Sequence, residues 1–176
     1  TNFIDTNQIK ANRDLTVTAN NGISYNNFYS GRNISLTNKD SGNIESSYKT
    51  YSVGKTDISN LAGAIILGAV GNPNSGSLFS GENLTISANS SFTSNLDIFS
   101  NQKINLTASA ITNNQKLTAA DEKLTASTSG SFINNGDLLV KDFELTASTL
   151  FKNTASFQSL ESIIADNSTS FENSSL

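Results

Sequence analysis

From residue 83 onward the chain repeats one phrase five times, as NLTISANSSF (83–92), KINLTASAIT (103–112), KLTASTSGSF (123–132), FELTASTLF (143–151) and SIIADNSTSF (162–171). The opening apolar residues follow one another at spacings of 20, 20, 19 and 20 residues: Leu84, Ile104, Leu124, Phe143 and Ile163. A second apolar residue usually follows eight positions later: Phe92, Phe132, Phe151 and Phe171. A fixed period of this length is typical of a solenoid, in which each repeat forms one coil that stacks on its neighbours.

The same pattern extends toward the amino terminus. Leu15 opens LTVTANNGI (15–23), and Ile34 opens ISLTNKDSGNI (34–44) 19 residues later. Between Ile34 and Leu84 the spacing is 50 residues, which is one period plus about thirty residues. We therefore interpret residues 1–176 as a single β-helical segment of a longer protein, with an insertion at 45–76 that interrupts the repeat.

Apolar residues also align at two further positions of the period. Position +2, counted from the opening residue, holds Val17, Leu36, Ile86, Leu106, Ala126, Leu145 and Ala165. Position −6 holds Ile9, Phe28, Leu78, Ile98 and Phe157, and the match slips by one at Leu117 and Leu138. Three short segments per coil, each with alternating inward residues, predict three strands. The expected fold is all-β: a right-handed parallel β-helix (solenoid) of about 20-residue, three-strand coils with one inserted loop or hairpin.

Asparagine recurs two residues after the phenylalanine of the phrase, at Asn134, Asn153 and Asn173. Asn tolerates left-handed backbone and bonds its own main chain at turns. Stacked equivalents also form Asn ladders in other stacked-strand structures. Both interpretations are structural.

The predicted insertion is the expected place for a specific contact, because extra residues in one repeat of a solenoid often lie on its binding face. Its run LAGAIILGAV (61–70) is the most apolar part of the chain. We expect this run to form a short helix or hairpin packed on the shaft, or else an exposed apolar patch for a partner. Tyrosine suits protein interfaces. The candidate partner contacts are Tyr48, Lys49, Tyr51, Lys55, Ile65, Ile66 and Leu67.

Composition excludes several classes of site. The chain has no His and no Cys, so it cannot form a Ser-His-Asp triad, a thiolate nucleophile or a metal site with Cys or His ligands. The net charge is −4, and Lys and Arg are scattered singly, which argues against nucleic acid as a partner. The longest apolar run, 61–70, is about half of the ~20 residues that a membrane span needs.

Acidic residues give little support for catalysis. Glycoside hydrolysis needs two acids within ~5–10 Å of each other on one face. Position −2 instead reads Arg13, Arg32, Glu82, Gln102, Glu122, Lys141, Glu161, and position −1 reads Asp14, Asn33, Asn83, Lys103, Lys123, Asp142, Ser162. Neither series places two acids in adjacent copies. We therefore predict no enzyme, no catalytic residue, no cofactor and no metal site, and keep a polysaccharide-degrading β-helix as a remote alternative.

Four segments resemble the filamentous haemagglutinin repeats of large bacterial exoproteins: LTVTANNG (15–22), NLTISANSSF (83–92), KINLTASAITNN (103–114) and KLTASTSGSFINNGDLLV (123–140). The part from Leu124 to Gly136 is closest to the family's pattern, and the resemblance covers nearly the whole chain except the insertion. It implies the β-helical shaft of a two-partner-secretion protein, located outside the cell or on the bacterial cell surface. It also implies an outer-membrane partner transporter during secretion.

The resemblance gives the functional expectation. We expect a structural and binding shaft segment of an adhesin-like exoprotein that mediates or projects contact with a receptor, protein or glycan, on a host or neighbouring cell. The alternative is the receptor-binding region of a contact-dependent growth inhibition effector.

Overall fold

The computed structural model describes residues 2–69, 76–147, 149–166 and 170–174. In these ranges the chain is all β, without a helix, and every strand pairing is parallel. The strands are β1 (Phe3–Ala11), β2 (Leu15–Ala19), β3 (Ile23–Ser30), β4 (Ile34–Asn38), β5 (Ile44–Ser52), β6 (Thr56–Asn60), β7 (Ile65–Leu67), β8 (Ser77–Ser80), β9 (Leu84–Ala88), β10 (Ser91–Ser94), β11 (Asp97–Ser100), β12 (Ile104–Ala108), β13 (Ala110–Asn113), β14 (Leu117–Thr128), β15 (Ser131–Asn134), β16 (Leu138–Ala147), β17 (Leu150–Asn153), β18 (Phe157–Asp166) and β19 (Ser170–Asn173).

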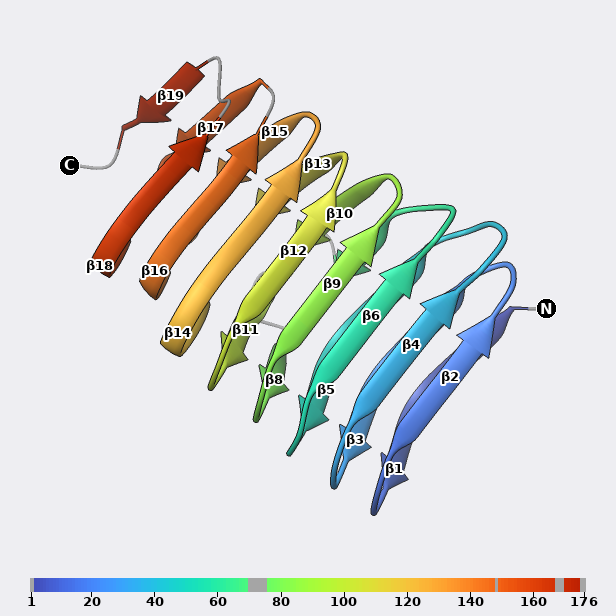
Figure 1. Ribbon diagram of the computed structural model, residues 1–176. Coiled ribbons are helices and arrows are strands. Elements are labelled where there is room, and N and C mark those ends of the chain that lie inside the picture. The colour runs from blue at the N-terminus through green and yellow to red at the C-terminus, as the bar shows by residue number, and fades with distance from the viewer. Residues whose placement is uncertain (1, 70–75, 148, 167–169, 175–176) are drawn as a thin grey trace.

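The strands wind into stacked coils with three faces (Figure 1). The first face contains β8 and β11, the second β9 and β12, and the third β7, β10, β13, β15, β17 and β19. Several strands bend across a corner and serve two faces, as β14 does by pairing with both β11 and β12. In Figure 1 the strands of the second face run toward the upper right in front while the coils advance toward the upper left, so the winding is right-handed.

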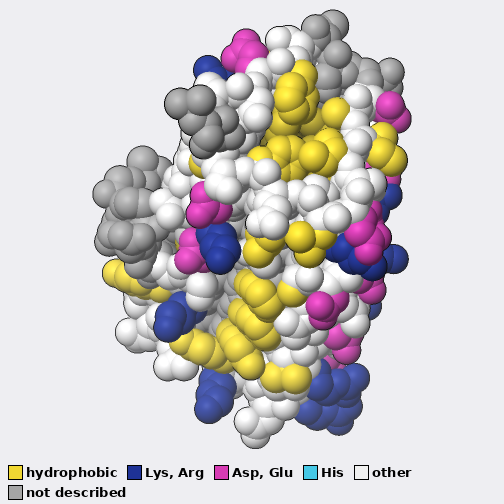
Figure 2. Space-filling view, turned by 90° about the vertical axis from the view of Figure 1, so that its left-hand side faces the viewer, with side chains coloured by type: hydrophobic (Ala, Val, Ile, Leu, Met, Phe, Trp, Pro, Cys, Tyr) yellow, Lys and Arg dark blue, Asp and Glu magenta, His cyan; other side chains and the backbone are white. Residues whose placement is uncertain are grey.

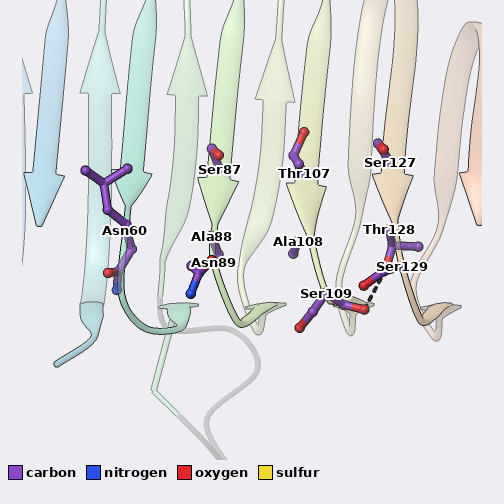
Figure 3. Close-up of a pocket in the computed structure, with 11 residues that line it drawn as sticks. Asn60, Ser87, Ala88, Asn89, Thr107, Ala108, Ser109, Ser127, Thr128 and Ser129 are labelled. Atoms are coloured by element: carbon purple, nitrogen blue, oxygen red, sulfur yellow. Dashed lines mark hydrogen bonds between the residues drawn. The ribbon is translucent and has the colours of Figure 1, made fainter. Parts of the chain in front are cut away.

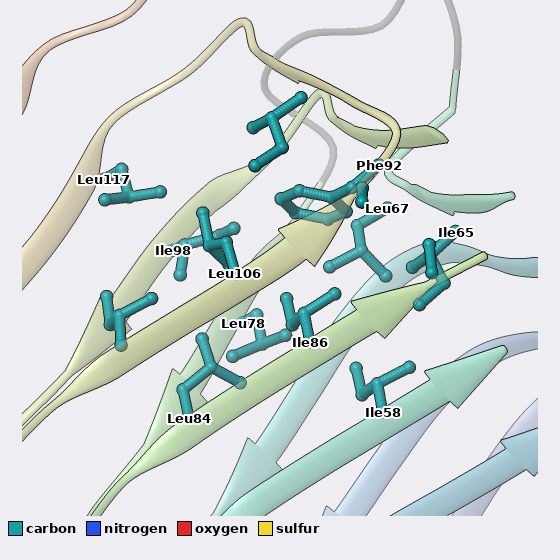
Figure 4. Packing of buried hydrophobic residues seen from close by; sticks show 14 of the residues in the cluster. Ile58, Ile65, Leu67, Leu78, Leu84, Ile86, Phe92, Ile98, Leu106 and Leu117 are labelled. Carbon is teal, nitrogen blue, oxygen red and sulfur yellow. The ribbon is translucent and has the colours of Figure 1, made fainter. Parts of the chain in front are cut away.

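Alternation along each strand builds the core. In β12, Ile104, Leu106 and Ala108 are buried, whereas Asn105 and Thr107 between them are exposed. The register places Ile104 between Leu84 and Leu124, so like residues stack on like residues from coil to coil. Figure 4 shows side chains from all three faces meeting in the interior. Each fully buried aliphatic or aromatic side chain contributes roughly 1.5–3 kcal/mol, which no single coil could obtain alone.

The predicted register is confirmed at the opening position, at +2 and at −6, including the slip at Leu117 and Leu138. There β14 and β16 pair with a register shift after Ala119. Small residues also stack at position −4 of the coils, as Ser80 does on Ser100. Ala119, rather than Ala120, pairs with Ser100 and is buried.

The insertion predicted at 45–76 is wrong over most of its length. The end of β5, with β6 and β7, forms a regular coil whose Thr56 pairs with Ile34 on one side and Leu84 on the other. Nine residues separate β7 from β8, against two between β10 and β11, so most of the surplus chain lies at 68–76. Of these, 70–75 lie outside the described residues.

Two threonines explain why this coil is hard to recognise. Thr50 and Thr56 occupy positions that hold apolar residues in most coils, and both are buried. Their hydroxyls are satisfied inside the fold: Thr56 lies 2.6 Å from the Ser52 hydroxyl, and Thr50 lies 2.8 Å from that of Tyr25. Hydrogen bonding removes most of the cost of burying a polar group, so the coil keeps its geometry without the expected apolar signal.

Asparagines stack in a ladder on the third face. Asn113 donates to Asn134, Asn134 to Asn153, and Asn153 to Asn173, at 2.8, 2.7 and 2.9 Å. The same amides also bond the turns that follow them, as Asn134 does with the Gly136 carbonyl at 2.6 Å. The ladder and the turn interpretations of these residues therefore both hold.

Candidate functional site

The structure divides the seven predicted contact residues into two groups. Four are exposed on the outside of the coils: Tyr48, Lys49, Tyr51 and Lys55. The other three form β7, in which Ile65 and Leu67 are fully buried core residues and Ile66 faces outward, half-buried. The predicted helix or hairpin at this place is wrong, and so is an exposed apolar patch containing Ile65 and Leu67, because strand alternation turns both inward.

Tyr51 belongs to a row of outward-facing rings along the first face. The rings of four successive coils, which we call the aromatic ladder, are Tyr29, Tyr51, Phe79 and Phe99. Their centroids are 6.4, 4.9 and 5.5 Å apart in that order. Three of these residues were not predicted, although each directly follows the −6 position of its coil.

The ladder ends at Tyr29 in one direction and at Phe99, whose partner in the next coil is Thr118, in the other. The Tyr51, Phe79 and Phe99 rings are stacked with interplanar angles of 13° and 5°, so they cover one another's faces. Tyr29 is tilted by 36° from Tyr51. The residue paired with Tyr29 in the preceding coil is Lys10 rather than a further aromatic residue. One face of the Tyr29 ring is thus left without an aromatic neighbour.

A hollow of about 310 Å³ lies at this end of the ladder. We call it the Gly31 notch, and its main walls are Tyr29, Tyr51, Val53, Lys10 and Asn12. Coil stacking requires a glycine at position 31, because a Cβ there would lie 2.2 Å from the Asn12 carbonyl oxygen. Val53, 55 % exposed, stands beside it as a wall.

Cations surround the notch. A second hollow of about 300 Å³ shares Gly31 and Val53 and includes Arg32, Lys55 and Glu82. Arg32 lies 3.7 Å from the Asp14 carboxylate. Within the described ranges, neither Lys10 nor Lys55 has a carboxylate at ion-pair distance. Figure 2 shows a band of hydrophobic side chains on this side of the molecule, with Lys and Arg side chains near its lower end.

A hollow of about 440 Å³ forms a shallow groove at the corner where strands of the second face end (Figure 3). Equivalent small side chains of successive coils line it, among them Ser87, Thr107 and Ser127. Its most buried hydroxyl, that of Thr128, donates to the Ser109 carbonyl at 2.8 Å. Among the residues that the structure describes, no charged side chain lines this groove. It therefore offers neither an acid and base pair nor a cluster of metal ligands.

Charged residues outside the notch pair across neighbouring coils. Lys103 lies 3.6 Å from Glu122, Lys141 lies 3.2 Å from Glu161, and Lys152 lies 3.7 Å from Glu172. A further pair joins Lys123 and Glu144. The hydrogen bond and charge of Glu161 raise the pKa of Lys141. In the parts of the chain that the structure describes, no three acidic side chains come together as a metal site would require.

One buried titratable group, Tyr25, lies inside the shaft. Its ring stacks on Phe28 with centroids 4.0 Å apart and an interplanar angle of 5°. Burial raises the pKa of Tyr25 to about 12, and the hydrogen bond to Thr50 offsets part of that effect. The Tyr25 hydroxyl is thus neutral at physiological pH and serves to satisfy the buried threonine.

No protein-family model, curated protein or solved structure matches this chain. Among the described residues, no helix has the length and apolar character that crossing a membrane requires. A functional proposal therefore depends on the coil architecture, the charge arrangement and the surface around the aromatic ladder.

Proposed function

We propose that this chain is a shaft segment of a large, adhesin-like bacterial exoprotein of the filamentous haemagglutinin type, secreted or held at the cell surface. The observation that carries the proposal is the continuous parallel ladder. Each inner strand pairs with an equivalent strand on both sides, as β12 does with β9 and β14. Length in such a structure scales with coil number, which suits a protein that must project a contact away from a cell.

The surface supports a mechanical and binding role over a chemical one. Outward residues of the second face are mostly hydroxyl-bearing, as Thr85, Ser87 and Thr107 are. Two of the acids that a polysaccharide-degrading enzyme could use are engaged with neighbouring coils: Glu144 pairs with Lys123, and Asp142 accepts a 2.5 Å hydrogen bond from Ser162. We propose that the segment acts without catalysis.

Export through an outer-membrane partner transporter is compatible with this architecture. Each coil of a solenoid contacts only the coils next to it, so coils can form one after another as the chain emerges. A buried coil such as that of Thr56 requires only the coils of Ile34 and Leu84 beside it. The resemblance to haemagglutinin repeats in the phrases around Leu124 is the second support for this partner.

Immunolabelling of intact bacteria that carry the natural gene tests the proposal. Antibodies against the described coils should label unpermeabilised cells, and cells without the gene should lose contact with target cells. Labelling that appears only after permeabilisation would sink the proposal. Mixed cultures distinguish the two versions of the function: an adhesin changes attachment alone, whereas a growth inhibition effector lowers the number of neighbouring cells.

A further inference from the structure

The Gly31 notch has the shape of a small-ligand site. Asn12, Gly31 and Val53 follow equivalent strand ends in three successive coils. Gly31 lies between the other two in the wall of the hollow and adds no side chain to it. Its volume of about 310 Å³ lies at the lower end of the range for small-molecule sites, about 300–1,000 Å³. A single ring-sized group fits this scale.

The notch also has an apolar wall. The face of Tyr29 that no other ring covers lies toward Lys10, and Tyr51 and Val53 continue the wall. The face of an aromatic ring carries partial negative charge, which attracts polarised C–H groups. A pyranose presents such C–H groups on one face and hydroxyls around its edge. Tyr29 therefore offers the kind of surface on which a sugar ring stacks.

The positively charged side chains at the notch favour an anionic ligand. Lys10 is exposed in the notch, Lys55 is exposed in the adjoining hollow, and neither forms an ion pair within the described residues. The acids nearby are Asp14, which pairs with Arg32, and Glu82 in the adjoining hollow. An ammonium bound to a carboxylate forms a charge-assisted hydrogen bond, which is stronger than a neutral one.

An extended acidic peptide fits less well. Peptides commonly bind sheet proteins by adding a strand at a free edge. At Gly31 the backbone of the notch is already paired, because the Gly31 amide donates to the Ala11 carbonyl at 2.9 Å. The Ser30 hydroxyl is also used internally, by the carbonyls of Arg13 and Asn33. The groups left for a ligand are side-chain donors and acceptors, such as the Asn12 amide and the Tyr51 hydroxyl.

We infer that the Gly31 notch binds a carboxylated pyranose, such as one uronate unit of an acidic polysaccharide, stacked on Tyr29 with its carboxylate on Lys10. The inference deepens the proposed function because it names a class of ligand for the side of the shaft. It rests on that function only for where the protein meets this ligand.

Saturation-transfer NMR and calorimetry on the purified protein test the inference, with tetragalacturonate as the probe. Maltotetraose is the neutral counterpart, and tetraglutamate is the acidic peptide counterpart. We expect tetragalacturonate to bind at least about tenfold more tightly than either of the two. Tyr29→Ala and Lys10→Gln should each weaken binding about tenfold.

Matched controls lie at the opposite end of the ladder. Phe99→Ala removes a ring and Lys116→Gln removes an exposed cation away from the notch, and binding should change less than about twofold. Lys10→Gln alters one exposed side chain, so it keeps the test valid if Tyr29→Ala unfolds. The inference would be overturned if tetragalacturonate did not bind, if maltotetraose bound with equal affinity, or if tetraglutamate bound more tightly. It would also be overturned if Phe99→Ala weakened the binding of tetragalacturonate as much as Tyr29→Ala does. None of these outcomes affects the shaft proposal, which depends on surface labelling.

Discussion

At the scale of single residues, several buried polar side chains are stable in this shaft because they hydrogen-bond to one another. Tyr25 is fully buried, and its hydroxyl bonds Thr50 at 2.8 Å. Thr56 is buried beside Ser52, which itself donates to the Gly54 carbonyl at 2.9 Å. These pairs let a coil tolerate polar residues at positions where its neighbours have Leu or Ile.

The raised pKa of Tyr25 predicts a loss of stability at high pH. Its folded-state pKa of about 12 exceeds the ordinary value of 10.0, so folding favours the neutral form. That stabilisation is fully present below pH 10 and is lost as pH rises through 12, at a cost of about 2–3 kcal/mol. Urea unfolding of the natural protein and of the Tyr25→Phe variant, measured at several pH values, checks this prediction. The free energy of unfolding should fall more steeply above pH 10 in the natural protein, and parallel curves would show that Tyr25 is not the group responsible.

At the scale of elements, the Asn ladder ties the third face to its turns. Asn134 is fully buried, donates to Gly136 and Asn153, and accepts from Asn113. Asn134→Ala should therefore lower the free energy of unfolding by about 2–4 kcal/mol, because it removes three bonds and leaves buried partners unsatisfied. The matched variant is Asn135→Ala in the exposed row next to it, whose amide donates to Asn114 at 2.9 Å. That change should cost about 1 kcal/mol or less, and equal costs would mean that the buried ladder does not stabilise the fold.

An element could be predicted from the sequence where its own residues carry the repeating apolar pattern. Spacing fixes the register at Ile104 and Leu124 because inward apolar residues must stack on one another. The coil of Thr56 escaped prediction because hydrogen bonding replaces the apolar pattern there. The notch at Gly31 could not be predicted, since it depends on three coils meeting around one missing side chain. The outward rings were visible in the sequence at Tyr29 and Phe99, but their stacking becomes evident only after the Thr56 coil is counted.

At the scale of the whole molecule, the central claim is that equivalent coils are interchangeable units of a shaft. Ile104 and Leu124 are register partners, and so are Phe92 and Ile111, and Ile111 and Phe132. Removing one complete period should thus bring together surfaces that already match. Because each coil contacts only its neighbours, the rest of the shaft should keep its structure.

The most direct measurement is an in-register deletion of residues 104–123, which joins Lys103 to Leu124. Circular dichroism of the shortened protein should retain the β signal, and thermal unfolding should stay cooperative. Solution scattering should show a particle shorter by about one strand spacing, ~4.8 Å. Deleting only 104–113 removes half a period and should abolish cooperative unfolding. Loss of the β signal after the full-period deletion, or equal tolerance of both deletions, would contradict the claim that this protein is a shaft of stacked, equivalent coils.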